Sequence, residues 1–179
     1  MGRGKKLQEL RHLPEEVLSE VVREGEMRLA AQFAAAAAAD QRAMSWFSLL
    51  VTITIAALGG AATLLVSGRF FYVAMTLLLF SFALLVASFK AVECVRPRLF
   101  SFPGNLPENW LPERWQDPDK LDIVQARVEQ SICLNNAIDD NKRLADAAGR
   151  NLQHSINVTI WALLLTIVSL AVAAMFESR

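Results

Sequence analysis

Three stretches without a charged residue constrain this chain more than any other feature. They cover residues 44–67, 70–89 and 156–176, and none contains Asp, Glu, Lys or Arg. A bilayer core about 30 Å thick requires about 20 apolar residues in a helix, and each stretch meets that length. A soluble core that enclosed three such helices would need far more chain than the 179 residues present. The sequence therefore predicts an all-α membrane protein with three transmembrane helices.

The basic residues predict how these spans are oriented. Seven Lys and Arg lie in residues 1–43 and nine in residues 90–155, whereas Arg69 and Arg179 stand alone at the other ends of the spans. Basic residues favour the cytoplasmic side of a membrane. Both long polar segments are therefore predicted to be cytoplasmic, with the N-terminus inside and the C-terminus outside. The first 43 residues lack an early apolar run, so we expect no cleavable signal.

This topology divides the chain, read as a multi-pass membrane protein, into four parts. The predicted parts are a cytoplasmic N-terminal helix (1–43), a transmembrane hairpin (44–92, with spans 44–67 and 70–89), a cytoplasmic loop and long helix (93–155) and a third transmembrane helix (156–176).

The N-terminal part is predicted to be a helix that continues into the first span. Pro14 suits the first turn of a helix, and no helix breaker follows it before Met44. One face at spacings of three or four is predicted to pack against another helix. That face consists of Leu18, Val22, Gly25, Leu29 and Phe33.

The segment after the second span reads as a proline- and tryptophan-rich loop followed by a long helix. The prolines exclude regular helix near Trp110 and Trp115, so we expect a loop on the membrane face or a loop that docks a partner. Asp117 and Pro118 suit the start of a helix that runs into the third span. A heptad seam along it includes Val128, Asn135, Ile138 and Lys142. The seam either packs on the N-terminal helix of the same chain or joins copies of the chain.

Basic residues gather where the second span ends. Lys90 can pair with Glu93 three residues on, and Pro97 disfavours helical geometry at Arg96 and so ends the helix. Lys90, Arg96 and Arg98 are then expected at the inner headgroup layer, where they anchor the chain to anionic lipid. The alternative is a site for a phosphate-bearing ligand, because arginine matches phosphate oxygens in a bidentate fashion.

Small and hydroxylated residues form one face of the first span and one face of the third. Such residues let membrane helices approach closely, and the alternative is that they line a pore formed by several copies. The residues concerned are Ser48, Thr52, Gly59 and Thr63 in the first span, and Thr159, Thr166 and Ser169 in the third.

The sequence contains no constellation typical of an enzyme. His12 and His154 are far apart, Cys94 and Cys133 lack metal-ligand spacing, and phosphate-loop, nucleophile-elbow and zinc-protease motifs are absent. We therefore predict no catalytic residue, no metal and no cofactor. No ionisable residue lies within the three stretches, which disfavours a proton-coupled pump.

The order of parts resembles small bacterial membrane effectors of anti-phage defence, namely the Pycsar transmembrane effector family and the SLATT class. The matching parts are the tight hairpin, the Arg-Pro-Arg at 96–98, the aromatic loop, and the helix at 135–155 that enters the last span. The resemblance implies a protein of the bacterial inner membrane that senses a nucleotide signal, either directly or through a protein that senses it. The protein would then oligomerise and damage the inner membrane. No separate nucleotide-binding domain is visible, which favours a protein partner.

Two functions follow as expectations. The first is an oligomeric inner-membrane effector without enzymatic activity that permeabilises the bilayer on a cytoplasmic signal. The alternative is a scaffolding subunit of a larger membrane complex. The expected partners are the lipid bilayer, further copies of the chain and a cytoplasmic signalling protein or nucleotide, with no nucleic acid polymer.

Overall fold

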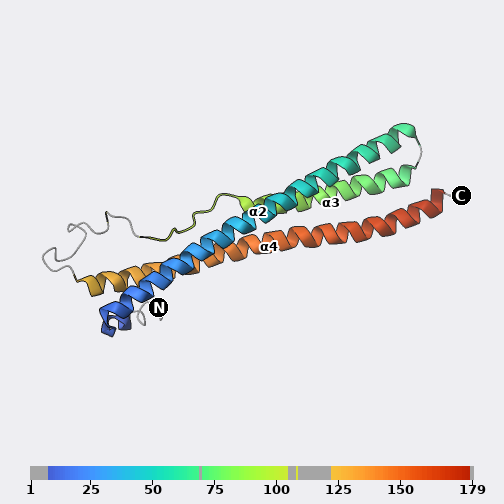
Figure 1. Ribbon diagram of the computed structural model, residues 1–179. Helices are drawn as coiled ribbons and strands as arrows, with labels where there is room; N and C mark the ends of the chain where they lie inside the picture. The colour runs from blue at the N-terminus through green and yellow to red at the C-terminus, as the bar shows by residue number, and fades with distance from the viewer. Residues whose placement is uncertain (1–7, 69, 105–107, 109–121, 178–179) are drawn as a thin grey trace. The chain divides into compact units, whose positions relative to one another are not determined.

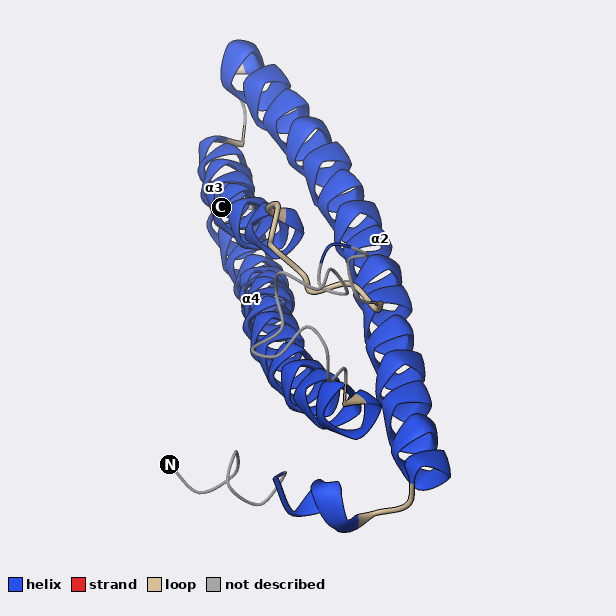
Figure 2. Cartoon of the chain, turned by 90° about the vertical axis from the view of Figure 1, so that its left-hand side faces the viewer, coloured by secondary structure: helices blue, strands red, loops and turns tan. Residues whose placement is uncertain are grey.

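The described part of the chain is almost wholly helical. The structure, a computed structural model, describes residues 8–68, 70–104, 108 and 122–177, and these contain no β-strand (Figures 1 and 2). A short 3-10 helix, η1 (Gln8–His12), precedes three long helices: α2 (Glu15–Ser67), α3 (Phe71–Val95) and α4 (Ile123–Glu177). Among the described residues, these three helices are long and apolar enough to cross a membrane. The prediction of an all-α chain with three helices of transmembrane length is confirmed.

Two of the helices continue from a polar segment into an apolar one without a break. α2 has 53 residues and α4 has 55, so the predicted continuity of both is confirmed. α2 begins just after Pro14, whose carbonyl accepts the Leu18 amide at 3.1 Å. The predicted start of the second long helix, at Asp117 and Pro118, lies outside the described residues. α4 begins at Ile123, where the Asp122 carboxylate caps it by accepting the amides of residues 124 and 125 at 3.0 and 3.3 Å.

The chain forms two compact units, and both long helices contribute to each. Unit 1 comprises residues 1–37 and 98–145, and unit 2 comprises residues 38–97 and 146–179. Unit 2 thus contains all of α3 and the three apolar stretches, whereas unit 1 contains the polar portions of α2 and α4.

Unit 2 is a three-helix unit with a thin apolar core. Leu50 of α2 packs with Leu84 and Ala87 of α3, and Trp46, Phe80 and Val158 pack against that cluster. One polar link joins the three helices. The Trp46 indole N–H donates to Ser155 Oγ of α4 at 3.0 Å, and that hydroxyl donates to the carbonyl of Ala87 at 2.7 Å. Ser155 is fully buried, so this link fixes the three helices at one level.

The connection between α2 and α3 is a tight turn, as predicted. Gly68 and Phe70 both have left-handed backbone conformations, with φ of +67° and 57°. Glycine adopts that conformation without a steric penalty, whereas other residues pay about 1–2 kcal/mol. Gly68 therefore lets α2 end at Ser67 and α3 begin at Phe71.

Unit 1 pairs the first part of α2 with the first part of α4 through both polar and apolar contacts. Gln130 Nε2 donates to the Glu26 carboxylate at 3.0 Å, and the Arg127 guanidinium contacts the Glu15 carboxylate at 3.1 Å. The helices approach closely at Gly25, where an added Cβ would lie 3.1 Å from the Leu134 side chain.

Four of the five residues on the predicted apolar face of α2 turn toward the interior of unit 1. Leu18 and Leu29 are fully buried, and Val22 and Gly25 are partly buried. Phe33 remains exposed but meets Phe102 with ring centroids 5.2 Å apart.

Candidate functional site

The end of α3 has the geometry that the Lys90–Pro97 sequence predicts. Lys90 Nζ donates to the Glu93 carboxylate at 2.8 Å. The helix ends at Val95, and Arg96 has an extended backbone with ψ of 138° just before Pro97. Arg96 is exposed, and Lys90 is partly exposed. Lys90 is therefore paired with the Glu93 carboxylate, and the exposed Arg96 acts on the same carboxylate through its charge, so that both help to lower the pKa of Glu93.

Arg98 has a different role from Arg96, because it helps to fix an extended segment in unit 1. We call residues 98–102 the strap. The Arg98 guanidinium donates to the carbonyl of Leu144 at 3.2 Å. Asn141, which is 1% exposed, accepts the Ser101 amide at 2.9 Å and donates to the Ser101 carbonyl at 3.0 Å. Asn141 thus pairs with a peptide group as a neighbouring strand would, and it anchors the strap to α4.

The small-residue face of the first span points away from the rest of unit 2. The buried positions of α2 in this region are Ala43, Leu50, Thr54 and Ala61. Ser48 and Thr52 each lie two residues from Leu50, which is about 200° around an α-helix. All four predicted residues of this face are exposed: Ser48, Thr52, Gly59 and Thr63. The Thr52 and Thr63 hydroxyls donate to carbonyls four residues earlier, at 2.9 Å each.

The corresponding face of the third span is turned inward. Thr159 and Thr166 are partly buried and donate to the carbonyls of Ser155 and Ala162 at 2.9 and 2.8 Å. Ala162, on the same face, is 7% exposed. Ser169 is exposed at the edge of this face. The small face of α4 therefore packs inside the chain, whereas that of α2 is left open.

Large apolar side chains cover the outward faces of the other two helices. On α3 they include Leu79 and Phe82, which are 69% and 67% exposed, and on α4 they include Trp161 and Leu165, which are 66% and 64% exposed. Such surfaces suit contact with lipid chains. The outward face of α2 differs from both in carrying a row of small and hydroxylated residues, beside exposed apolar side chains such as Ile55 and Val66, which are 65% and 90% exposed.

The predicted seam of α4 has no single environment. Val128 is buried within unit 1, Asn135 and Ile138 are partly exposed, and Lys142 further along is exposed. The side of α4 that contacts α2 and the strap instead includes Arg127, Gln130, Leu134 and Asn141. Apart from Leu134, these residues are polar, so apolar periodicity in the sequence does not mark them.

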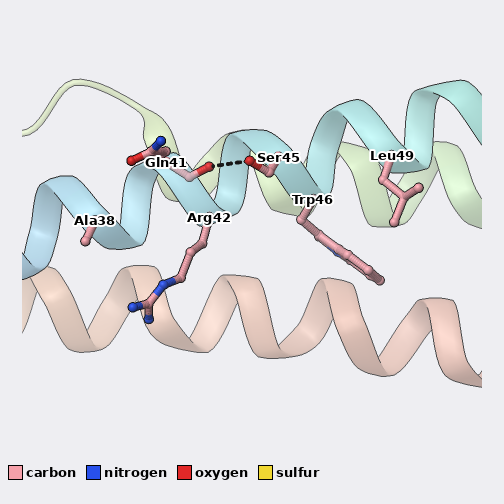
Figure 3. A pocket seen from close by; sticks show the side chains of 6 residues that line it. All are labelled: Ala38, Gln41, Arg42, Ser45, Trp46 and Leu49. Carbon is pink, nitrogen blue, oxygen red and sulfur yellow. Dashed lines mark hydrogen bonds between the residues drawn. The ribbon is translucent and has the colours of Figure 1, made fainter.

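Two of the grooves formed by described residues lie within unit 2. One, of about 410 Å³, is lined by residues of α3 and α4 such as Tyr72, Leu79 and Ser169, so that it includes one residue of the predicted small face. The other, of about 600 Å³, is lined by one side of α2 (Figure 3). Its residues are Ala38, Gln41, Arg42, Ser45, Trp46 and Leu49.

Comparison with protein-family models, curated proteins and solved structures finds no match to this chain. The described residues also contain no group of three or more His, Cys, Asp or Glu side chains that could hold a metal ion.

Proposed function

We propose that this chain is a non-enzymatic effector of the bacterial inner membrane. In this proposal, copies associate through the outward face of α2 and permeabilise the bilayer when a cytoplasmic signal reaches unit 1. The single observation that supports it most is the exposed small-residue face of Ser48, Thr52, Gly59 and Thr63. The resemblance to the Pycsar transmembrane effector family and the SLATT class supplies the context of anti-phage defence.

The physical argument concerns how membrane helices associate. Lipid chains are as apolar as the helices, so association depends on close van der Waals packing and hydrogen bonds between helices rather than on a hydrophobic driving force. Small residues allow the backbones to approach, and the exposed oxygens of Thr52 and Thr63 keep spare capacity to accept hydrogen bonds. Because the rest of the chain leaves this face open, a second copy is the partner that the proposal assigns to it.

Unit 1 supplies a suitable receiver for the signal. Its two helices are joined by polar as well as apolar contacts. Gln32 has a buried Oε1 without a hydrogen-bond partner among the described residues, although its Nε2 donates to the Ile138 carbonyl at 3.2 Å. A buried acceptor without a partner costs free energy. A cytoplasmic protein or nucleotide that led to a rearrangement in which Gln32 Oε1 gains a donor would therefore be favoured. The proposed orientation, with unit 1 in the cytoplasm, follows from the basic residues.

Strong induction in bacterial cells, followed with a membrane-potential dye, tests the proposal. High expression favours assembly by mass action, so the wild-type chain is expected to depolarise cells. Ala56→Leu, which adds bulk to the outward face of α2, should prevent depolarisation. Ala171→Leu adds the same bulk to an exposed position of α4 and should not prevent it. An intact potential in cells that contain the assembled wild-type oligomer would contradict the proposal.

A scaffolding subunit is the second candidate, and exposed apolar residues in unit 1 favour it. Met27, Leu99 and Phe102 are 59%, 97% and 67% exposed, and such side chains can anchor a partner protein. Purification in mild detergent separates the two functions. A stoichiometric foreign subunit would support the scaffold, and a homo-oligomer would support the effector.

A further inference from the structure

The groove on α2 is polar at one end and apolar at the other, as a phospholipid is. Gln41 and Arg42 precede the uncharged stretch that begins at residue 44, whereas Leu49 lies inside it. From Arg42 to Leu49 the helix rises about 10 Å. The groove therefore offers a cation and polar groups at one end and apolar walls at the other, over the distance at which a headgroup gives way to acyl chains.

The Arg42 guanidinium is open to a ligand. Arg42 is exposed, and no carboxylate within the described residues pairs with it. Figure 3 shows that Arg42 and Trp46 leave α2 on the same side. Trp46 is held in place because its indole N–H donates to Ser155 Oγ at 3.0 Å. A fixed tryptophan one turn from a free arginine provides a rigid wall beside a phosphate-binding group.

From this geometry we infer that the Arg42 groove binds one anionic phospholipid. Its phosphate pairs with the Arg42 guanidinium, and one acyl chain lies along Trp46 and Leu49. A guanidinium binds phosphate oxygens in a bidentate fashion, and tryptophan is enriched at the level of the headgroups. A free phosphate would leave the apolar end of the groove empty, so the groove fits a phospholipid better than a free phosphate. The site requires only that α2 enters a bilayer, and it is independent of any permeabilising activity.

Brominated lipids provide a direct test, because bromine on acyl chains quenches nearby tryptophan. The chain has four tryptophans, so Trp110, Trp115 and Trp161 are replaced by phenylalanine to leave Trp46 alone. The full chain is reconstituted into vesicles that contain brominated phosphatidylglycerol or brominated phosphatidylcholine at equal mole fraction. We expect phosphatidylglycerol to bind beside Trp46 about fivefold more tightly, the ratio that one interfacial basic residue supplies.

Arg42→Gln should abolish this preference. Arg28→Gln is the matched control, because Arg28 is also exposed on α2 but lies 16 residues before Met44, about 24 Å along the helix. It should keep the preference, and Arg42→Lys should keep part of it.

Three outcomes would overturn the inference. Equal quenching of the wild-type chain by the two lipids would show that no anionic lipid is selected. If the preference for phosphatidylglycerol survived in Arg42→Gln, it would be due to the general surface charge and not to Arg42. Displacement of the lipid effect by soluble glycerol phosphate would assign the groove to a free phosphate ligand instead. An unchanged Trp46 emission maximum in the Arg42 variants, in vesicles without bromine, confirms that their local fold is intact.

Discussion

If copies associate through α2 as proposed, Ala56→Leu and Gly59→Leu are each expected to convert the detergent-purified oligomer into monomers. Ala56 and Gly59 are exposed on α2 among the small residues of its outward face. A leucine there would hold two helix backbones apart, and overpacking of a close contact costs about 1–3 kcal/mol. That cost corresponds to a dissociation constant about 5- to 150-fold weaker. Mass measurements of the particles over a dilution series would give the constant.

The same substitution elsewhere provides the control for this prediction. Ala171 is exposed on α4, where the neighbouring outward residues are large, including Leu164 and Val168. Ala171→Leu adds a side chain that lipid can accommodate, so the oligomer should persist. Each variant should keep the thermal stability of the wild-type monomer, because nothing within 4 Å would meet a Cβ at Gly59. A monomeric wild-type chain, or an oligomer insensitive to both α2 substitutions, would refute the role of this face.

Asn141→Leu is expected to release the strap from α4. Asn141 both accepts from and donates to the Ser101 peptide group, at 2.9 and 3.0 Å. Leucine can do neither, and it leaves those partly buried backbone groups without partners at a cost of about 1–3 kcal/mol. The amide of Ser101 should then exchange its hydrogen about 5- to 150-fold faster. Hydrogen–deuterium exchange of peptides that cover residues 98–104 measures this rate.

Asn136→Leu distinguishes loss of the specific pair from a general effect of leucine on α4. Asn136 is exposed on the same helix, so its replacement should leave exchange at Ser101 unchanged. Unchanged protection of the strap in Asn141→Leu would mean that Arg98 and Phe102 suffice to hold it, and the anchoring role of Asn141 would be abandoned.

The apolar and helix-ending residues made most of the fold predictable. Uncharged stretches of 20 or more residues identify spans because each must match the bilayer. Pro97 identified the end of α3 because it restricts Arg96. The absence of a breaker before Met44 identified the continuity of α2. Each of these features acts on residues close to it in the sequence, so its structural effect can be predicted without knowing the tertiary contacts.

The polar contacts were not predictable in the same way. The Trp46–Ser155–Ala87 link joins residues 109 and 68 positions apart, and no local pattern marks such partners. Asn141 was missed because the predicted seam followed apolar spacing and passed through Lys142, which is exposed. A polar residue in a helix is predicted to be exposed unless the segment that forms hydrogen bonds with it is known.

The candidate sites were predicted in part. The small face of the first span could be listed from its spacing, but only the packing of unit 2 distinguishes it as open and that of the third span as closed. Lys90, Arg96 and Arg98 were grouped by proximity in sequence. The predicted pair of Lys90 with Glu93 is confirmed, but the bond from Arg98 to the Leu144 carbonyl was not predictable. Arg42 was overlooked because its groove depends on the position of Trp46.

Thiol labelling tests most directly the claim that unit 1 lies in the cytoplasm while three helices cross the membrane. Cys133 is exposed in unit 1, whereas Cys94 is buried. A membrane-impermeant maleimide should label Cys133 in inverted vesicles and not in intact spheroplasts. Ser67→Cys, in a Cys133→Ser background, should show the reverse because it marks the turn between the first two spans. Labelling of Cys133 from outside intact spheroplasts would contradict the orientation and the functions proposed from it.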